Sequence, residues 1–135
     1  EGGLRAGTLN TAGIVGFGKA CEIAKRDIKE NYDKLSIIQS EFEIFIESNN
    51  KGEVIAKNVS RLPHISNIIL NEDAESFMIR NKDKICVSTG SACNSSIETP
   101  SHVLKALNLG ENVKKCLRFS FDKNLSYSIV DIKFN

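Results

Sequence analysis

A long amphipathic helix is the feature of this 135-residue sequence that most constrains its fold. Between positions 14 and 45, apolar residues recur at steps of three, four or seven, which is the spacing of one helix face. Asn31 is a candidate for a kink or a break into two helices, and the polar run 48–52 should end the helical segment. The apolar positions are Ile14, Phe17, Cys21, Ala24, Ile28, Leu35, Ile38, Phe42 and Phe45.

The rest of the chain predicts shorter elements in mixed order. Strands are expected over 53–56, 65–70, 85–87 and 116–121. Helices are expected over 71–80, from Pro100 to about 108–110, and over 125–132, with Asn71 or Asp73 capping the first and Thr99 the second. The elements do not alternate regularly as strand, helix, strand. The pattern therefore predicts one α+β domain, with a small and mostly antiparallel sheet packed against helices.

Composition excludes several classes of function. Eighteen basic residues face seventeen acidic ones, so no bulk charge favours nucleic acid or an anionic membrane. No apolar run approaches the roughly 20 residues that cross a bilayer. The chain opens at Glu1 without a signal-peptide pattern, and Met78 is its one methionine. We expect a cytoplasmic protein with reduced thiols, cut from a longer polypeptide.

Cys93 differs from the other three cysteines of the chain. Cys21, Cys86 and Cys116 lie on apolar helix or strand patterns, where a buried small side chain is expected. Cys93 stands in a run of small and polar residues, 88–96, where it is either a mobile nucleophile or an incidental exposed thiol. The cysteine spacings fit no zinc or iron–sulfur motif, so no metal site is expected.

The two histidines, one arginine and three glycines are weaker candidates for functional residues. His64 and His102 have no carboxylate in a motif and are expected to be structural. Arg118 is flanked by apolar strand residues, so it either reaches the surface or faces a cleft and binds a carboxylate or phosphate. Three glycines fall inside the predicted helix, where close helix packing is favoured over nucleotide binding: Gly13, Gly16 and Gly18.

Three segments carry a resemblance to a known family. They are G-L-R-A-G-T-L-N over 3–10, V-S-T-G-S-A-C over 87–93 with the P-S-x-V-L-K-A-L stretch after it, and L-R-F-S over 117–120. In register from Glu1 to about Phe121, they resemble NifS/IscS-type cysteine desulfurases. These enzymes are class V aminotransferase-like proteins with the pyridoxal-phosphate fold type I. The resemblance implies that the expected α+β fold is like the C-terminal domain of such enzymes.

The resemblance also implies an activity and site residues. Enzymes of this family convert L-cysteine to alanine and an enzyme-bound persulfide, which supplies sulfur for iron–sulfur cluster assembly and tRNA thiolation. By resemblance, Cys93 is the persulfide-forming nucleophile and Arg118 binds the substrate carboxylate. Thr8 would contact the cofactor phosphate across a homodimer interface. A sulfur-acceptor or scaffold protein is the implied partner, and the segment 91–98 should be weakly ordered so that the thiol can move.

Departures from the family pattern define what this chain lacks. No lysine follows a histidine here, whereas the family's cofactor lysine does. Residues 1–135 are therefore expected to form the C-terminal small domain, with 1–10 a remnant of the segment after the large domain. Pyridoxal phosphate would be bound by the full-length enzyme and not by this inactive fragment. The alternatives are a selenocysteine lyase-like enzyme, or a cofactor-free sulfur-relay or interaction module that uses Cys93.

Overall fold

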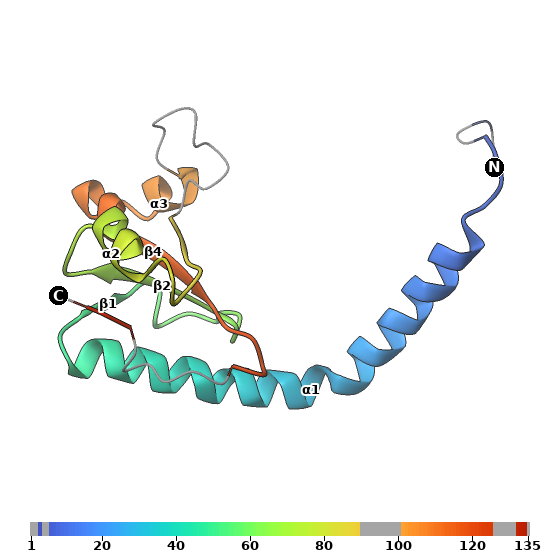
Figure 1. Cartoon of the computed structure of the whole chain (residues 1–135), viewed down its shortest axis with the longest axis horizontal. Helices are drawn as coiled ribbons and strands as arrows, with labels where there is room; N and C mark the ends of the chain where they lie inside the picture. The colour runs from blue at the N-terminus through green and yellow to red at the C-terminus, as the bar shows by residue number, and fades with distance from the viewer. Residues whose placement is uncertain (1–2, 4–5, 90–100, 126–131, 135) are drawn as a thin grey trace. The chain divides into compact units, whose positions relative to one another are not determined.

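The computed structural model describes residues 3, 6–89, 101–125 and 132–134, which form two compact units, Glu1–Asn31 and Tyr32–Asn135 (Figure 1). Helix α1 (Thr11–Ser48) contributes to both units. It is continuous at Asn31, where the sequence allowed a break, and it ends at the predicted place. The side chain of Asn10 accepts a hydrogen bond from the Gly13 amide at 3.0 Å, which satisfies one open amide of the first turn.

The second unit contains a four-stranded sheet in which all neighbouring strands are antiparallel. The strand order is β1-β2-β4-β3. This arrangement confirms the predicted α+β class with a small antiparallel sheet. The strands are β1 (Gly52–Val54), β2 (Ile65–Leu70), β3 (Ser88–Thr89) and β4 (Cys116–Ser120).

The prediction of a strand over 85–87 is wrong. Strand β3 follows it instead, because Ser88 and Thr89 are the residues that pair with β4. Ile85 and Val87 are partly buried against the main core, so they pack as apolar side chains without belonging to the ladder. An apolar run alone does not distinguish these two uses.

Two short helices and a 3₁₀ helix complete the second unit: α2 (Ala74–Asn81), α3 (His102–Ala106) and η2 (Gly110–Lys115). Of the two predicted caps for α2, Asp73 is right, and its side chain accepts the Ser76 amide at 2.9 Å. This hydrogen bond lowers the pKa of the Asp73 carboxyl. The helix predicted from Pro100 begins at His102, and the predicted Thr99 cap lies outside the described residues, as does most of the predicted helix 125–132.

The main core lies between one face of the sheet and the C-terminal part of α1. Phe42 of α1 packs its ring 4.8 Å from that of Phe119 on β4, and Phe77 of α2 lies 6.0 Å from the same ring. The alternating burial of β2 places Ser66, Ile68 and Leu70 on this face, as expected for a strand with one face in a core. Aromatic and branched side chains therefore fix the sheet on the helix.

A smaller cluster covers part of the opposite face of the sheet. Cys116 of β4 is buried there with Leu104 of α3 and Ile55, and Ile69 of β2 packs against them. Helix α3 and η2 are thus attached to the end of β4 that begins at Cys116. No helix in the described part of the chain is long and apolar enough to cross a membrane.

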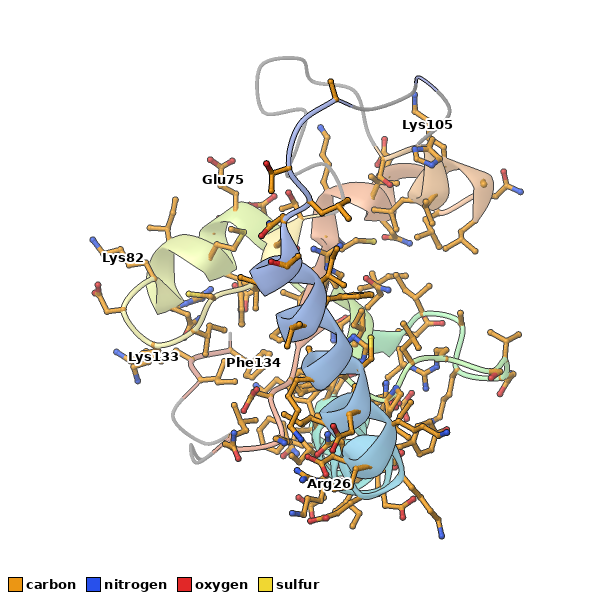
Figure 2. All side chains as sticks on the ribbon, turned by 90° about the vertical axis from the view of Figure 1, so that its right-hand side faces the viewer. Arg26, Glu75, Lys82, Lys105, Lys133 and Phe134 are labelled. Carbon is orange, nitrogen blue, oxygen red and sulfur yellow. The ribbon has the colours of Figure 1, made fainter. Side chains whose placement is uncertain are left out.

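The buried side-chain amide of Asn81 binds the C-terminal segment 132–134. Asn81, at the end of α2, donates to the Lys133 carbonyl at 2.9 Å and accepts from the Lys133 amide at 2.9 Å. It also donates to the Phe77 carbonyl at 3.0 Å. Phe134 then packs its ring 5.1 Å from Phe77, so residues 132–134 extend the main core (Figure 2).

Candidate functional site

A polar row crosses three strands on the face of the sheet away from the main core. Arg118 of β4 is the paired neighbour of Asn67 on β2 and of Ser88 on β3. Directly paired residues share a face and bring their side chains within about 5 Å of each other. Leu117 and Phe119, on either side of Arg118, are buried, whereas Arg118 itself is exposed. Arg118 therefore presents a cation on the side of the sheet away from the main core, where it could bind an anionic group.

The described elements before and after the Cys93 segment, β3 and α3, both contact β4. Before it, β3 pairs with β4 through Ser88 and Thr89. After it, α3 is held by buried Leu104, which packs with Cys116 of β4. In the sequence, Cys93 lies between these two elements. Cys93 and the segment 91–98, for which weak order was predicted, lie outside the described residues.

Thr8 belongs to the first unit, where it is exposed shortly before α1 begins. A threonine hydroxyl can donate a hydrogen bond to a phosphate oxygen. Because the two units are described separately, no geometry relates Thr8 to Arg118. The contact of Thr8 with a cofactor stays a prediction.

The thiols outside the Cys93 segment divide into one buried and two exposed groups. Cys116 is buried as predicted; its Sγ donates to the Asn112 carbonyl at 3.2 Å, and burial raises the pKa of the thiol. Cys21 and Cys86 are exposed, so their predicted burial is wrong. Cys86 lies before β3 rather than inside a strand, and Cys21 lies on a helix face that the described chain leaves uncovered. Among the described residues, no group of three or more His, Cys, Asp or Glu could hold a metal ion.

The structure gives no functional role to the two histidines or the helix glycines that the sequence singled out. His64 is partly buried, and its carbonyl accepts the Phe121 amide at 2.9 Å, while His102 is the exposed first residue of α3. Apart from adjacent residues and the helix's own backbone, no atom of the described chain lies within 4 Å of the place that a Cβ would take at Gly16 or Gly18. Close helix packing at these glycines is therefore not found within the described residues.

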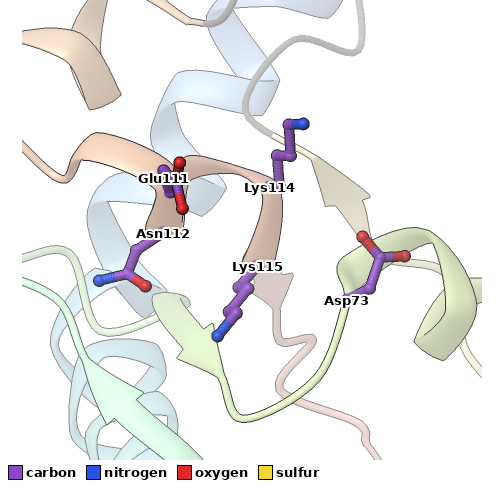
Figure 3. Close-up of a pocket in the computed structure, with 5 residues that line it drawn as sticks. All are labelled: Asp73, Glu111, Asn112, Lys114 and Lys115. Atoms are coloured by element: carbon purple, nitrogen blue, oxygen red, sulfur yellow. The ribbon is translucent and has the colours of Figure 1, made fainter.

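Hollows around η2 were not predicted from the sequence. One of about 340 Å³ is lined by Asp73, Glu111, Asn112, Lys114 and Lys115, and Figure 3 shows these side chains around it. A neighbouring hollow of about 600 Å³ shares Glu111 and Lys114. The charge of Lys114 contributes to lowering the pKa of Asp73. Acidic, amide and lysine side chains are mixed in their linings, and no arrangement of them in the described residues indicates a particular chemistry.

A third hollow, of about 250 Å³, lies beside β4. It is lined by Lys84, Ile85, Cys86, Val87, Phe119, Ser120, Phe121, Asp122 and Leu125. The sequence did not indicate it, because residues 85–87 were expected to be paired in a strand.

Comparisons with known proteins agree on one family. The family model "Aminotransferase class-V" matches residues 2–131. "Cysteine desulfurase IscS" of Vibrio atlanticus (strain LGP32) is 34% identical over 140 residues, which are 98% of this chain and 34% of that protein. A protein of the same name from Pseudomonas putida (strain W619) is 35% identical over 133 residues, which are 97% of this chain and 33% of that protein.

Solved structures show the same fold. A NifS-like protein from Rickettsia africae ESF-5 matches with a TM-score of 0.72 and 32% identity, over 96% of this chain and 33% of that one. DndA from Streptomyces lividans matches with a TM-score of 0.61 and 29% identity, over 87% of this chain and 33% of that one. The chain spans about a third of the length of the relatives it matches.

Proposed function

Because the chain belongs to the aminotransferase class-V family, we propose that residues 1–135 form the C-terminal small domain of a cysteine desulfurase. In this proposal, residues 1–10 continue the segment that follows the large domain. The complete enzyme converts L-cysteine to alanine and leaves a persulfide on Cys93. It works as a homodimer and passes the sulfur to an acceptor or scaffold protein, for iron–sulfur cluster assembly or tRNA thiolation.

The observation that carries the proposal is the placement of Arg118. An exposed guanidinium on β4 lies beside Ser88, from whose strand the Cys93 segment departs. Guanidinium groups bind carboxylates through two parallel hydrogen bonds, which also fix the orientation of the bound molecule. The substrate carboxylate would thus be anchored on the strand that the elements before and after the Cys93 segment both contact.

The cofactor fits this chain in part. Thr8, an exposed residue, would donate its hydroxyl to the phosphate of pyridoxal phosphate, but neither histidine of the chain is followed by a lysine that could attach the cofactor. When bound, pyridoxal phosphate withdraws electrons from the substrate's α-carbon. The groups that attach the cofactor and hold its ring are assigned to the part of the enzyme that this chain does not include.

The residues of this chain then perform two tasks. Arg118 binds the substrate carboxylate and so orients the thiol of L-cysteine. The Cys93 thiolate forms a sulfur–sulfur bond with the substrate's sulfur as the carbon–sulfur bond breaks. The electron pair of the broken bond remains on carbon, which takes up a proton and becomes the methyl group of alanine. The persulfide on Cys93 holds the transferred sulfur.

Substitution of Cys93 tests the proposal in the complete polypeptide that carries this chain. Cys93→Ser should abolish sulfide release from L-cysteine in the presence of a thiol reductant, because a hydroxyl cannot accept the sulfur. The absorbance of bound pyridoxal phosphate should be unchanged. Cys86→Ser is the matched control, since Cys86 is an exposed thiol to which the proposal gives no role. Substantial turnover by the Cys93→Ser enzyme would exclude Cys93 as the nucleophile.

A further inference from the structure

Asn67 is a residue that its own strand does not explain. It lies in the middle of β2, which pairs with β1 on one side and with β4 on the other. Asparagine is depleted in strands, where β-branched and aromatic side chains fit the pleated surface better. The residues that share its face of β2 are the apolar Ile65 and Ile69. The packing of the sheet therefore gives no reason for an amide at this position.

The side-chain amide of Asn67 makes no hydrogen bond with any residue that the structure describes. Its backbone is engaged, since the Asn67 carbonyl accepts the Ile55 amide at 2.8 Å. The residue is only partly exposed, and a polar group that folding removes from water costs free energy unless it finds a hydrogen-bond partner. The donor and the acceptor of this amide are thus available to a neighbouring flexible side chain and to a bound molecule.

The neighbour of Asn67 on β4 is Arg118, and the two strands lie side by side in Figure 1. Directly paired residues place their Cβ atoms about 5 Å apart on one face of the sheet, which is within reach of a long side chain. Ser88 lies on the other side of Arg118, on β3. Within the described residues, neither the Arg118 guanidinium nor the Ser88 hydroxyl makes a hydrogen bond or an ion pair. The polar row therefore consists of three side chains that can all donate and that have no described acceptor.

A carboxylate has more acceptor capacity than one guanidinium uses. Its two oxygens offer about four lone-pair sites, and a two-point contact with arginine occupies two of them. The others need further donors when the anion is removed from water. The Nδ2 group of an asparagine has two N–H donors, while its Oδ1 can accept from a guanidinium at the same time. An amide beside an arginine can therefore hold both the arginine and the anion.

We propose that Asn67 is a second carboxylate-binding residue, which accepts a hydrogen bond from the Arg118 guanidinium through Oδ1 and donates from Nδ2 to the substrate carboxylate. The inference rests on the proposed function, in which Arg118 binds the carboxylate of L-cysteine, and it adds specificity to that site. A carboxylate only accepts, whereas the NH₂ group of an α-carboxamide would meet donors on Asn67 and Arg118. The site should therefore select amino acids with a free α-carboxylate over their amides.

Binding of L-alanine tests the inference without the desulfurase reaction. The complete polypeptide, loaded with pyridoxal phosphate, should be titrated with L-alanine, with the absorbance of the bound cofactor as readout. Asn67→Ala should raise the Kd for L-alanine at least about tenfold, because a hydrogen bond to a charged group is lost. Asn58→Ala is the matched control; it removes an exposed amide from the connection between β1 and β2 and should leave the Kd unchanged. An unchanged Kd for Asn67→Ala would overturn the proposal.

The unsubstituted polypeptide provides the test of specificity. L-alaninamide, which lacks the carboxylate, should bind at least about tenfold more weakly than L-alanine. Equal binding of the two ligands, or no binding of L-alanine, would overturn the proposal. Because sulfide is not measured, a protein that keeps turnover after Cys93→Ser loses the proposed reaction but not this site. A protein that passes the Cys93 test and binds L-alanine equally well after Asn67→Ala fails this inference alone.

Two further variants separate a contact with the carboxylate from a structural role of Asn67. Asn67→Asp keeps the size of the side chain and an acceptor for Arg118, but it replaces the donor by a negative oxygen that repels the ligand. L-alanine should therefore bind more weakly to Asn67→Asp than to Asn67→Ala, whereas a structural role gives the opposite order. In an Arg118→Ala polypeptide, Asn67→Ala should raise the Kd by less than about threefold, because the two residues act on one carboxylate. The opposite order of the Asp and Ala variants, or independent losses at the two positions, would contradict the shared site.

Discussion

The carboxylate of Glu43 on α1 accepts two hydrogen bonds from the guanidinium of Arg61, at 2.6 and 2.9 Å. The Ser66 hydroxyl of β2 donates to the same carboxylate. Burial raises the pKa of Glu43, but the hydrogen bonds from Arg61 and Ser66, together with the charges of Arg61 and Lys57, outweigh it and bring the pKa below its ordinary value. Through Glu43, Arg61 and Ser66, α1 is therefore linked to the connection before β2 and to β2 itself. This contact depends on pH because it requires the ionised Glu43 carboxylate.

Acid should weaken this contact. A carboxyl whose pKa is lowered by folding contributes stability above its unfolded-state pKa and loses that contribution as the pH falls through its folded-state pKa. Glu43→Gln should lower the free energy of unfolding by roughly 1.5–3 kcal/mol at pH 7, and the difference from wild type should narrow below the ordinary carboxyl pKa. Urea denaturation at a series of pH values, from pH 7 to well below the ordinary carboxyl pKa, measures both effects. Exposed Glu41→Gln is the control and should change little; a pH-independent difference for Glu43→Gln would contradict the explanation.

Arg118→Ala should impair the use of L-cysteine by the complete enzyme. Loss of a charged, two-point hydrogen bond costs roughly 1.5–3 kcal/mol, so kcat/KM should fall at least tenfold. Ser120→Ala supplies the comparison, since Ser120 is exposed on the same strand and the same side as Arg118. Steady-state alanine formation is the measurement, and an unchanged kcat/KM for Arg118→Ala would assign its guanidinium to the protein surface alone.

The 135-residue chain should not retain pyridoxal phosphate covalently. Neither His64 nor His102 precedes a lysine, so the attachment motif of the family is missing from the sequence. After incubation with the cofactor, borohydride reduction and desalting, mass spectrometry should find the unmodified chain. A stoichiometric adduct on one particular lysine would show that the chain has an attachment site of its own. A scatter of substoichiometric adducts over several exposed lysines would not.

Gly52→Ala should destabilise the sheet. A Cβ at Gly52 would lie 2.5 Å from the Ile69 carbonyl oxygen, and backbone on the neighbouring strand cannot give way cheaply. Overpacking of this kind costs roughly 1–3 kcal/mol, which thermal or urea unfolding would detect. Gly18→Ala is the opposite case: apart from adjacent residues and the helix's own backbone, its Cβ would meet no atom of the described chain within 4 Å, and alanine is favoured over glycine in a helix interior by up to about 1 kcal/mol. An unaltered stability of Gly52→Ala would mean that β1 can shift away from β2.

Local patterns predicted the elements whose determinants lie close in sequence. The β-rich run 65–70 was predicted with the bounds that β2 has. The cap of α2 could be narrowed to two residues, because the Asp73 side chain acts on an amide three positions away. The strand expected over 85–87 was displaced to Ser88–Thr89, because the partner strand decides where a ladder begins. The fold class needed no such long-range information.

Features that depend on distant partners were not predictable. Glu43 and Arg61 are 18 positions apart, and neither lies in a motif that indicates the other. The burial expected for Cys21 followed from helix periodicity, which shows that a face is apolar but not whether its cover lies in the same stretch of chain. The residues around Arg118 in its own strand did not decide whether its side chain reaches the surface or faces a cleft. Its neighbours on β2 and β3 depend on the order of the strands in the sheet, which the sequence did not predict.

The contact between Asn81 and the C-terminal segment has a consequence for sequence variation. Asn81 recognises position 133 through peptide groups alone, while the Lys133 side chain is exposed (Figure 2). Nineteen residue types can supply the amide that Asn81 Oδ1 accepts, and proline cannot. Position 133 should therefore drift freely among homologous sequences while position 81 remains fixed, and a substituted tail should be accepted there if it avoids proline and keeps an aromatic ring at position 134.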